Sequence, residues 1–294
     1  MMFDLDRMCA ERRRPLLMGI VNVTGDSFSE GPASAPETAV ERALALLEDG
    51  ADILDIGGES TRPGSLEIPE EEELARVLPV IQALRKQRPE AVLSIDTRKA
   101  SVAEAVLKLG VSIVNDVSML RYSPEMASVV AGSGAVLVIG HSRGTPRTMR
   151  SLEFCDYGAD VVAAVAAELE QAKKQAMEAG VREDRIVVDP NFGFAKTPEQ
   201  DWELLRRIDE FHRLGPVLAG ISRKSFLGAF LNRPVPAAGW EELSPRRFFW
   251  LIARWKSCGF TMSGKSVMRS GYTTVCGSDE GFELRTECDE CWRG

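Results

Sequence analysis

Polar side chains stand at the ends of several short apolar runs in this chain, where stability alone would not place them. Asn22 lies near the end of the run 16–23, Asp96 follows 91–95, and Asn115 and Asp189 follow two later runs. Burying an unpaired carboxylate is costly, so a charge that directly follows a buried strand needs another explanation. Repetition of the pattern predicts chemistry at the carboxyl ends of parallel strands.

The side chains fall into two chemical groups. Asp96, Asn115 and Asp189 offer hydrogen-bond acceptors, and Lys224 follows the last clear strand and adds a donor. Such a set suits a flat heterocycle that presents N–H donors. Asn22, Thr61 and Arg62 offer an amide, a hydroxyl and a guanidinium on outer loops, which suit phosphate oxygens and a hydrated Mg²⁺.

Each residue also has a simpler explanation. An Asp after a strand is often a helix cap, Asn115 could be a turn residue, and Arg62 could be a solvated surface charge. Lys224 could simply begin a helix. Seven strand ends show the same pattern. The functional interpretation is therefore stronger for the whole set than for any single residue.

The elements that must position these residues alternate between strand and helix. Apolar runs typical of buried strands are followed by turn residues and then by helical periodicity. Seven strands are predicted at 16–23, 51–56, 91–95, 111–114, 135–139, 186–189 and 216–221. This order predicts an α/β fold, a (β/α)8 TIM barrel, with its site on the face formed by the strand carboxyl ends.

Composition narrows the class of protein. The 294 residues are 44% hydrophobic and 27% charged, which is enough for one barrel of about 250 residues. A net charge of −8 argues against nucleic acid as a partner. No apolar stretch approaches the roughly 18 residues of a membrane span, and the charged N-terminus has no signal-peptide core. We therefore expect a cytoplasmic protein with no membrane partner.

The sequence shows no clear eighth strand–helix unit. We divide the chain into an N-terminal extension (1–14), a barrel (15–238) and an atypical tail (239–294) that carries four of the six cysteines. Residues 246–256 are predicted to form a helix, 260–262 is only a fragment of a strand, and the chain from 265 on is typical of loop or disorder. Such a tail is either a divergent extension or a replacement of the original end, and it leaves the barrel one strand short.

The motifs carry a family resemblance over about residues 15–232. Residues 18–31 (MGIVNVTGDSFSEG) and 55–64 (DIGGESTRPG) resemble the first two signatures of dihydropteroate synthases. Further motifs follow in the same order, namely Ser94–Thr97, Val114–Asp116, Asp189–Lys196 and Gly220–Phe226.

The resemblance implies a pterin-binding TIM barrel that condenses 6-hydroxymethyl-7,8-dihydropterin pyrophosphate with p-aminobenzoate, with Mg²⁺, in folate biosynthesis. Pterin would bind Asp96, Asn115, Asp189 and Lys224, and Mg²⁺ would bind Asn22. The aminobenzoate would lie among Phe28, Thr61, Arg62, Pro63, Phe194, Ser222 and Lys224, and catalysis would rest on Arg62, Lys224 and Asp96. Sulfonamides mimic aminobenzoate and would contact the Phe28 and Thr61–Pro63 loops. The resemblance leaves open an enzyme that is sulfonamide-insensitive and confers antibiotic resistance. A homodimer is also implied.

The chain departs from the family at four places. The family has Gly at positions 191 and 195, Met at 140, and an Arg-x-His pair on strand eight, whereas the only histidines here are His141 and His212. Two alternatives stay open: a pterin-binding protein with impaired catalysis, and a methyltetrahydrofolate-dependent methyltransferase domain. The second should lack the loops at 60–64 and 222–225 that are present here.

Overall fold

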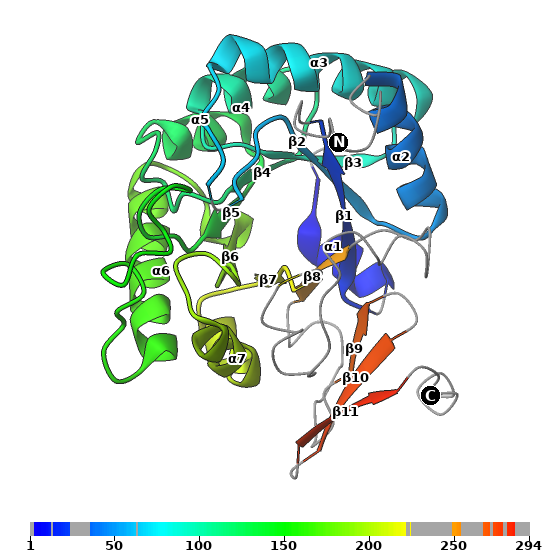
Figure 1. The fold of residues 1–294 in the computed structure, drawn as a ribbon. Coiled ribbons are helices and arrows are strands. Elements are labelled where there is room, and N and C mark those ends of the chain that lie inside the picture. Colours follow the sequence, from blue (N-terminus) through cyan, green and yellow to red (C-terminus); the bar gives the residue numbers. More distant parts are fainter. Residues whose placement is uncertain are drawn as a thin grey trace.

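The computed structural model describes residues 3–12, 14–23, 36–62, 64–221 and 224, together with four strands of the tail. Eight strands close a barrel in chain order (Figure 1). They are β1 (Leu16–Asn22), β2 (Ile53–Gly57), β3 (Val92–Asp96), β4 (Ile113–Asp116), β5 (Val136–Gly140), β6 (Ile186–Asp189), β7 (Val217–Ala219) and β8 (Phe249–Ala253). The expected TIM barrel is confirmed for the first seven strands, which are parallel to one another.

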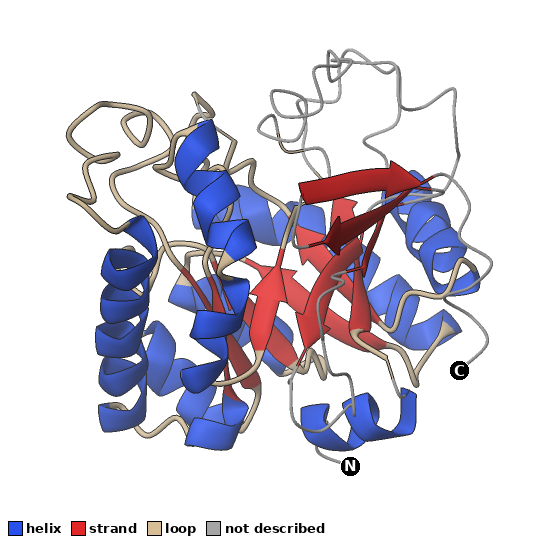
Figure 2. Cartoon of the chain, turned by 90° about the horizontal axis from the view of Figure 1, so that it is seen from below, coloured by secondary structure: helices blue, strands red, loops and turns tan. Residues whose placement is uncertain are grey.

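Helices surround the barrel (Figures 1 and 2). They are α1 (Leu5–Arg12), α2 (Pro36–Glu48), α3 (Glu70–Gln87), α4 (Ala100–Leu107), α5 (Met126–Ser133), α6 (Val161–Glu178) and α7 (Pro198–Arg206), with short 3-10 helices at Glu183–Arg185 and Ile208–Arg213. The second of these 3-10 helices begins two residues after the end of α7. Strands β2 and β5 are buried along their whole length because helices cover their outer face and side chains fill the barrel.

Helix starts follow local sequence signals. Thr197 begins α7 with a capping box, in which its hydroxyl accepts from the Gln200 N–H and the Gln200 side chain accepts from the Thr197 N–H. Asp160 begins α6 by accepting from the N–H groups of Val162 and Ala163. These caps fix where the loops after β5 and β6 end, and both loops contribute to the site.

Helix α1 was not predicted from the sequence. It lies at the amino ends of the strands (Figure 2), and Leu5 and Cys9 pack against the barrel interior with Met18, Ile53 and Leu218. The expected extension therefore contains a helix that covers this end of the barrel core.

Strand β8 overturns two expectations about the tail. The helix predicted for 246–256 is wrong where the structure describes it, because Phe249–Ala253 is a strand. The barrel is also not one strand short: β8 pairs with β1 and with β7, but antiparallel to both. The apolar composition of 249–253 does not encode the direction of the strand.

Residues beyond 265 also contain regular structure. β9 (Val267–Ser270), β10 (Thr273–Ser278) and β11 (Gly281–Arg285) form an antiparallel sheet with β10 in the centre, so loop or disorder is wrong for these residues. The predicted fragment 260–262 lies outside the described residues. None of the helices described is long and apolar enough to cross a membrane.

Candidate active site

One row of paired residues crosses the carboxyl ends of β1 to β4. Asn22 pairs with Gly57, Gly57 with Asp96, and Asp96 with Asn115. On β6, Asp189 pairs with Gly140 of β5. The pairing brings the predicted strand-end residues to the same edge of the barrel, as parallel strands require.

Three acceptor atoms face this edge without a protein donor. Asp96 Oδ1, Asn115 Oδ1 and Asp189 Oδ2 are buried and have no hydrogen-bond partner among the described residues. Buried acceptors are rarely left unpaired, and each one costs free energy. A ligand with several N–H donors along one edge would satisfy them together.

Two carboxyl groups at this edge hold their protons more tightly than exposed carboxyl groups do. Burial raises the pKa of Asp189 to about 7, although an N–H of Asn191 and the nearby lysines oppose the shift. Burial and the neighbouring carboxylates of Asp55 and Glu73 raise the pKa of Asp96 well above its ordinary value. Asp189 can therefore exchange a proton with a ligand near neutral pH, and Asp96 is protonated more readily than an exposed carboxyl group.

Asp55 belongs to this cluster, and sequence reasoning missed it. It lies in the middle of β2, is 2% exposed, and its Oδ2 accepts a 2.9 Å hydrogen bond from Nδ2 of Asn115. Burial raises the pKa of Asp55 as well. As with Asp189, the sequence signal is a carboxylate next to apolar residues. Asp189 ends its strand, however, whereas Asp55 lies two residues before the end of β2.

Lys224 approaches the cluster from the loop after β7. Its Nζ lies 4.8 Å from the centre of the Phe194 ring, which is a cation–π contact. Its Cδ lies 3.4 Å from the position that a Cβ on Gly193 would occupy, so a larger residue at 193 would crowd the lysine. Burial lowers the pKa of Lys224, and Asp189, Asp201 and Asp96 oppose this shift.

The loop after β6 is held in shape by a second buried lysine. Lys196 Nζ lies 2.8 Å from the carbonyl oxygen of Phe194, 3.2 Å from that of Asn191 and 3.1 Å from Nδ1 of His141. Asn191 and Ala195 have φ values of 56° and 52°, in the left-handed region that favours glycine. The loop thus keeps its shape where the family has glycine at both positions.

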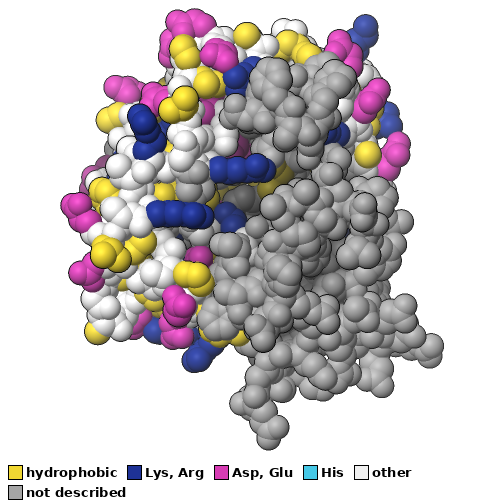
Figure 3. All heavy atoms as spheres, viewed as in Figure 1, with side chains coloured by type: hydrophobic (Ala, Val, Ile, Leu, Met, Phe, Trp, Pro, Cys, Tyr) yellow, Lys and Arg dark blue, Asp and Glu magenta, His cyan; other side chains and the backbone are white. Residues whose placement is uncertain are grey.

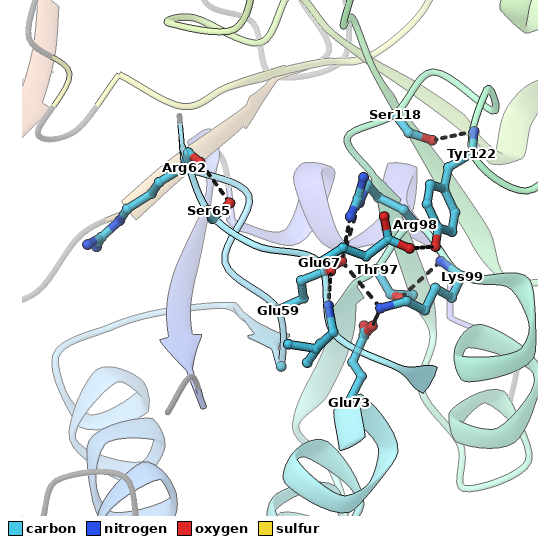
Figure 4. A network of polar contacts seen from close by, with 12 residues as sticks. Glu59, Arg62, Ser65, Glu67, Glu73, Thr97, Arg98, Lys99, Ser118 and Tyr122 are labelled. Atoms are coloured by element: carbon cyan, nitrogen blue, oxygen red, sulfur yellow. Dashed lines mark hydrogen bonds and ion pairs between the residues drawn. The ribbon is translucent and has the colours of Figure 1, made fainter. Parts of the chain in front are cut away.

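The loop after β2 holds Thr61 and Arg62 above a buried ionic network. Glu59 accepts from Arg98 at 2.8 Å and lies 3.4 Å from Lys99 Nζ, which also contacts Glu73 at 2.5 Å (Figure 4). The exposed Arg62 points away from this network, while its carbonyl oxygen accepts from Ser65. The network therefore anchors the base of the loop and leaves the Arg62 guanidinium exposed at its tip.

Thr61 and Phe194 share a small cavity. It has a volume of about 140 Å³ and is also lined by Arg98, Ser142 and Met149, among others. A hydrogen bond of 2.9 Å from the Gly64 N–H to the Pro146 carbonyl joins the loops after β2 and β5 beside it. A larger hollow of about 460 Å³ lies away from the strand-end cluster, beside the N-terminal ends of α3 and α4.

Asn22 is exposed at the end of β1, and its Oδ1 lies 3.9 Å from the position of a Cβ on Gly57. In the described part of the chain, no group of three His, Cys, Asp or Glu side chains is placed to hold a metal ion. A single amide oxygen fits Mg²⁺ only as one ligand among substrate phosphates and water, which is how this ion commonly binds.

The structure brings together Asn22, Asp96, Asn115, Asp189, Phe194 and Lys224, with Thr61 and Arg62 on the loop above. Phe28, Pro63 and Ser222, which were expected to contact aminobenzoate, lie outside the described residues. Figure 3 shows Lys and Arg side chains beside the hollow on this face of the molecule, where their positive charge would attract a phosphate group.

Comparison with known proteins decides the family. Residues 18–246 match the model of the pterin binding enzyme family. The chain belongs to this family.

Its relatives include dihydropteroate synthases. The enzyme of Synechocystis sp. is 43% identical over 226 residues, which cover 76% of this chain and 77% of the relative. The structure of Xanthomonas albilineans dihydropteroate synthase with 4-aminobenzoic acid is 42% identical, with a TM-score of 0.68 over 75% of this chain and 77% of that one. The Yersinia pestis enzyme in complex with a sulfonamide drug is 38% identical, with a TM-score of 0.69 over 76% and 80%.

The expected function, a transferase of folate biosynthesis with dihydropteroate synthase activity, is therefore confirmed. The alternative of a methyltransferase domain is not needed to explain any of these matches.

Proposed function

We propose that the strand-end cluster binds the dihydropterin ring and that the surrounding loops bind pyrophosphate and p-aminobenzoate. The observation that carries the proposal is a set of three buried acceptors that have no hydrogen-bond partner in the described part of the chain, Asp96 Oδ1, Asn115 Oδ1 and Asp189 Oδ2. A dihydropterin presents ring and amino N–H groups along one edge, so it can satisfy all three. Lys224 supplies a donor for its acceptor atoms.

Condensation needs a leaving group to depart and an amine to attack. The bond from the exocyclic methylene carbon to the pyrophosphate oxygen breaks, the aminobenzoate nitrogen bonds to that carbon, and this nitrogen loses a proton. Arg62, exposed at the loop tip, neutralises charge on the departing pyrophosphate. The arylamine is a nucleophile near pH 7 without a Ser or Cys intermediate.

Asn22 would hold Mg²⁺ through its amide oxygen, together with phosphate oxygens and water. When bound, the ion would supply positive charge to the leaving group. Phe194, which lies under Lys224, would form one wall of the aminobenzoate pocket, with Thr61 on the opposite loop. We propose a cytoplasmic location on the sequence features given above, and the family resemblance implies a homodimer.

A second candidate function is a pterin-binding protein with impaired catalysis. It is favoured by β8, which runs antiparallel to β1 and β7, so that its amino end lies at the site face. A strand of this direction cannot present an Arg-x-His pair from its carboxyl end, as the family does.

Calorimetry and turnover distinguish the two functions. We expect 6-hydroxymethylpterin to bind the wild-type chain and to bind Asn115→Ala at least ten-fold more weakly, since the variant lacks one acceptor. Equal affinity of the two proteins would contradict the placement of the pterin. Normal pterin binding without product formation would support the second candidate.

A further inference from the structure

Asn115 can present either its oxygen or its NH₂ group to the site, depending on how the amide is turned. A pterin N–H needs the oxygen, so the wrong orientation would replace an acceptor by a donor and leave two donors facing each other. The strand alone does not decide between the two orientations, because they differ only by rotation about the last side-chain bond. A neighbouring group must decide.

Asp55 is that neighbour. Its Oδ2 lies 2.9 Å from Nδ2 of Asn115, and both side chains are at most 2% exposed. A carboxylate oxygen accepts and does not donate, so the bond draws the NH₂ group towards β2. Asn115 Oδ1 is then left facing away, buried and without a partner among the described residues.

The bond does not depend on the charge of Asp55. Asp55 Oδ1 is buried and makes no hydrogen bond of good geometry in the described part of the chain, although the nearby Ser94 hydroxyl lowers the pKa of Asp55, so a proton on the carboxyl group would reside on Oδ1. Oδ2 would still accept from Asn115. The same orientation of the amide therefore holds in both protonation states.

We infer that Asp55 is a positioning residue for pterin recognition, which fixes the amide of Asn115 so that its oxygen faces the ring. This inference rests on the proposed placement of the pterin. It assigns a role to the buried charge in the middle of β2, which touches neither phosphate nor aminobenzoate in that arrangement.

A reciprocal exchange of the two side chains tests the inference. In Asn115→Asp, two carboxyl groups face each other and can be joined only through a proton on one of them, which removes the fixed N–H donor, so affinity for 6-hydroxymethylpterin should fall about ten-fold or more. In Asp55→Asn/Asn115→Asp, the new Asn at 55 donates to the new Asp at 115, whose second oxygen faces the ring. The double variant should recover at least half of the lost affinity on a logarithmic scale.

Steady-state kinetics provide the control for a merely structural role. Asp55→Ala should raise the KM for the pterin substrate about ten-fold and change the KM for aminobenzoate less than two-fold, because only the pterin contacts Asn115. A loss of folding would lower the amount of active enzyme and leave both KM values unchanged.

The outcomes separate the two claims. If Asn115→Ala weakens pterin binding but the double variant binds no better than Asn115→Asp, Asp55 does not orient the amide and the inference is wrong. If Asn115→Ala itself binds pterin normally, the proposed pterin site is wrong. Recovery in the double variant, together with the selective change in KM, supports the inference.

Discussion

Nζ of Lys196 lies 3.1 Å from Nδ1 of His141, and both side chains are buried beneath the loop that follows β6. On its other side, His141 Nε2 lies 3.3 Å from Glu168 Oε2. A neutral imidazole fits both neighbours, with its proton on Nε2 towards the carboxylate and Nδ1 accepting from the lysine. Burial, with Lys196 in support, lowers the pKa of His141 to about 3.

We expect His141 to make the fold sensitive to acid. The unfolded chain binds a proton on this histidine near pH 6.5, whereas the folded chain does so only near pH 3, so stability is lost as pH falls between these values. His141→Asn should flatten the decline in unfolding free energy between pH 6.5 and 4.5 by roughly 2 kcal/mol. Denaturant titrations at several pH values measure it.

His212→Asn is the control for this experiment. His212 is only partly buried, whereas His141 is fully buried, and burial lowers the pKa of His212. Its replacement should change the pH slope less than that of His141. Equal slopes for wild type and His141→Asn would show that the histidine is not held neutral.

Asp189→Asn should weaken pterin binding more than it harms the fold. Burial raises the pKa of Asp189 to about 7, so the stability that its protonated form contributes to the folded protein is lost as pH rises through that value. An amide does not ionise, so Asp189→Asn should keep or raise the melting temperature at pH 8. Loss of an acceptor for ring N–H groups should cost roughly 2–3 kcal/mol of binding free energy. Calorimetry measures the loss of pterin affinity, and thermal melts measure the effect on the fold. Unchanged affinity would remove Asp189 from the site.

Asn191→Gly should stabilise the protein. Asn191 has a φ of 56° and is fully buried, and neither polar atom of its side chain has a hydrogen-bond partner among the described residues. Glycine relieves both costs, worth about 1–2 kcal/mol. Ala163→Gly, on the exposed face of α6, should instead lower the unfolding free energy by about 1 kcal/mol. A loss of stability in Asn191→Gly would mean that the Asn191 side chain makes stabilising hydrogen bonds in the wild-type protein.

Arg62→Ala should lower kcat more than it weakens pterin affinity. Negative charge on the leaving oxygen grows in the transition state, and an exposed guanidinium at the loop tip can neutralise it there. Steady-state kinetics and calorimetry with the same variant separate the two quantities. A fall in pterin affinity with kcat intact would assign Arg62 to binding alone.

Leu251→Pro should open the barrel. Residue 251 pairs with Leu17 of β1 and Ala219 of β7, and proline removes its N–H. The unfolding free energy should fall by roughly 3 kcal/mol. Val275→Pro, in the separate sheet of the tail, is the matched control and should leave the melting temperature of the barrel unchanged. An equally small effect of both variants would show that β8 does not close the barrel.

The sequence predicted what strand patterns and turn residues determine. Asp96, Asn115 and Asp189 were recognisable because each follows an apolar run, and parallel strands must bring such positions to one edge. Asp55 escaped notice because a charge within a strand is not at an expected strand end. Its role depends on a side-chain bond between strands that are not adjacent, and spacing does not encode that bond.

The ends of the chain were harder to predict for a different reason. Helix α1 shows only Leu5 and Cys9 on its buried face, which is too short a pattern to identify a helix. The direction of β8 is set by how the chain returns to the gap between β1 and β7. That return depends on tertiary pairing, and the apolar run 249–253 is compatible with either direction.

Formation of dihydropteroate by the purified chain tests the central claim most directly. With the pterin pyrophosphate, p-aminobenzoate and Mg²⁺, we expect one pyrophosphate released for each dihydropteroate formed, and at least a ten-fold lower kcat/KM for Asp189→Asn. A folded wild-type chain that binds 6-hydroxymethylpterin but forms no dihydropteroate would contradict the claim.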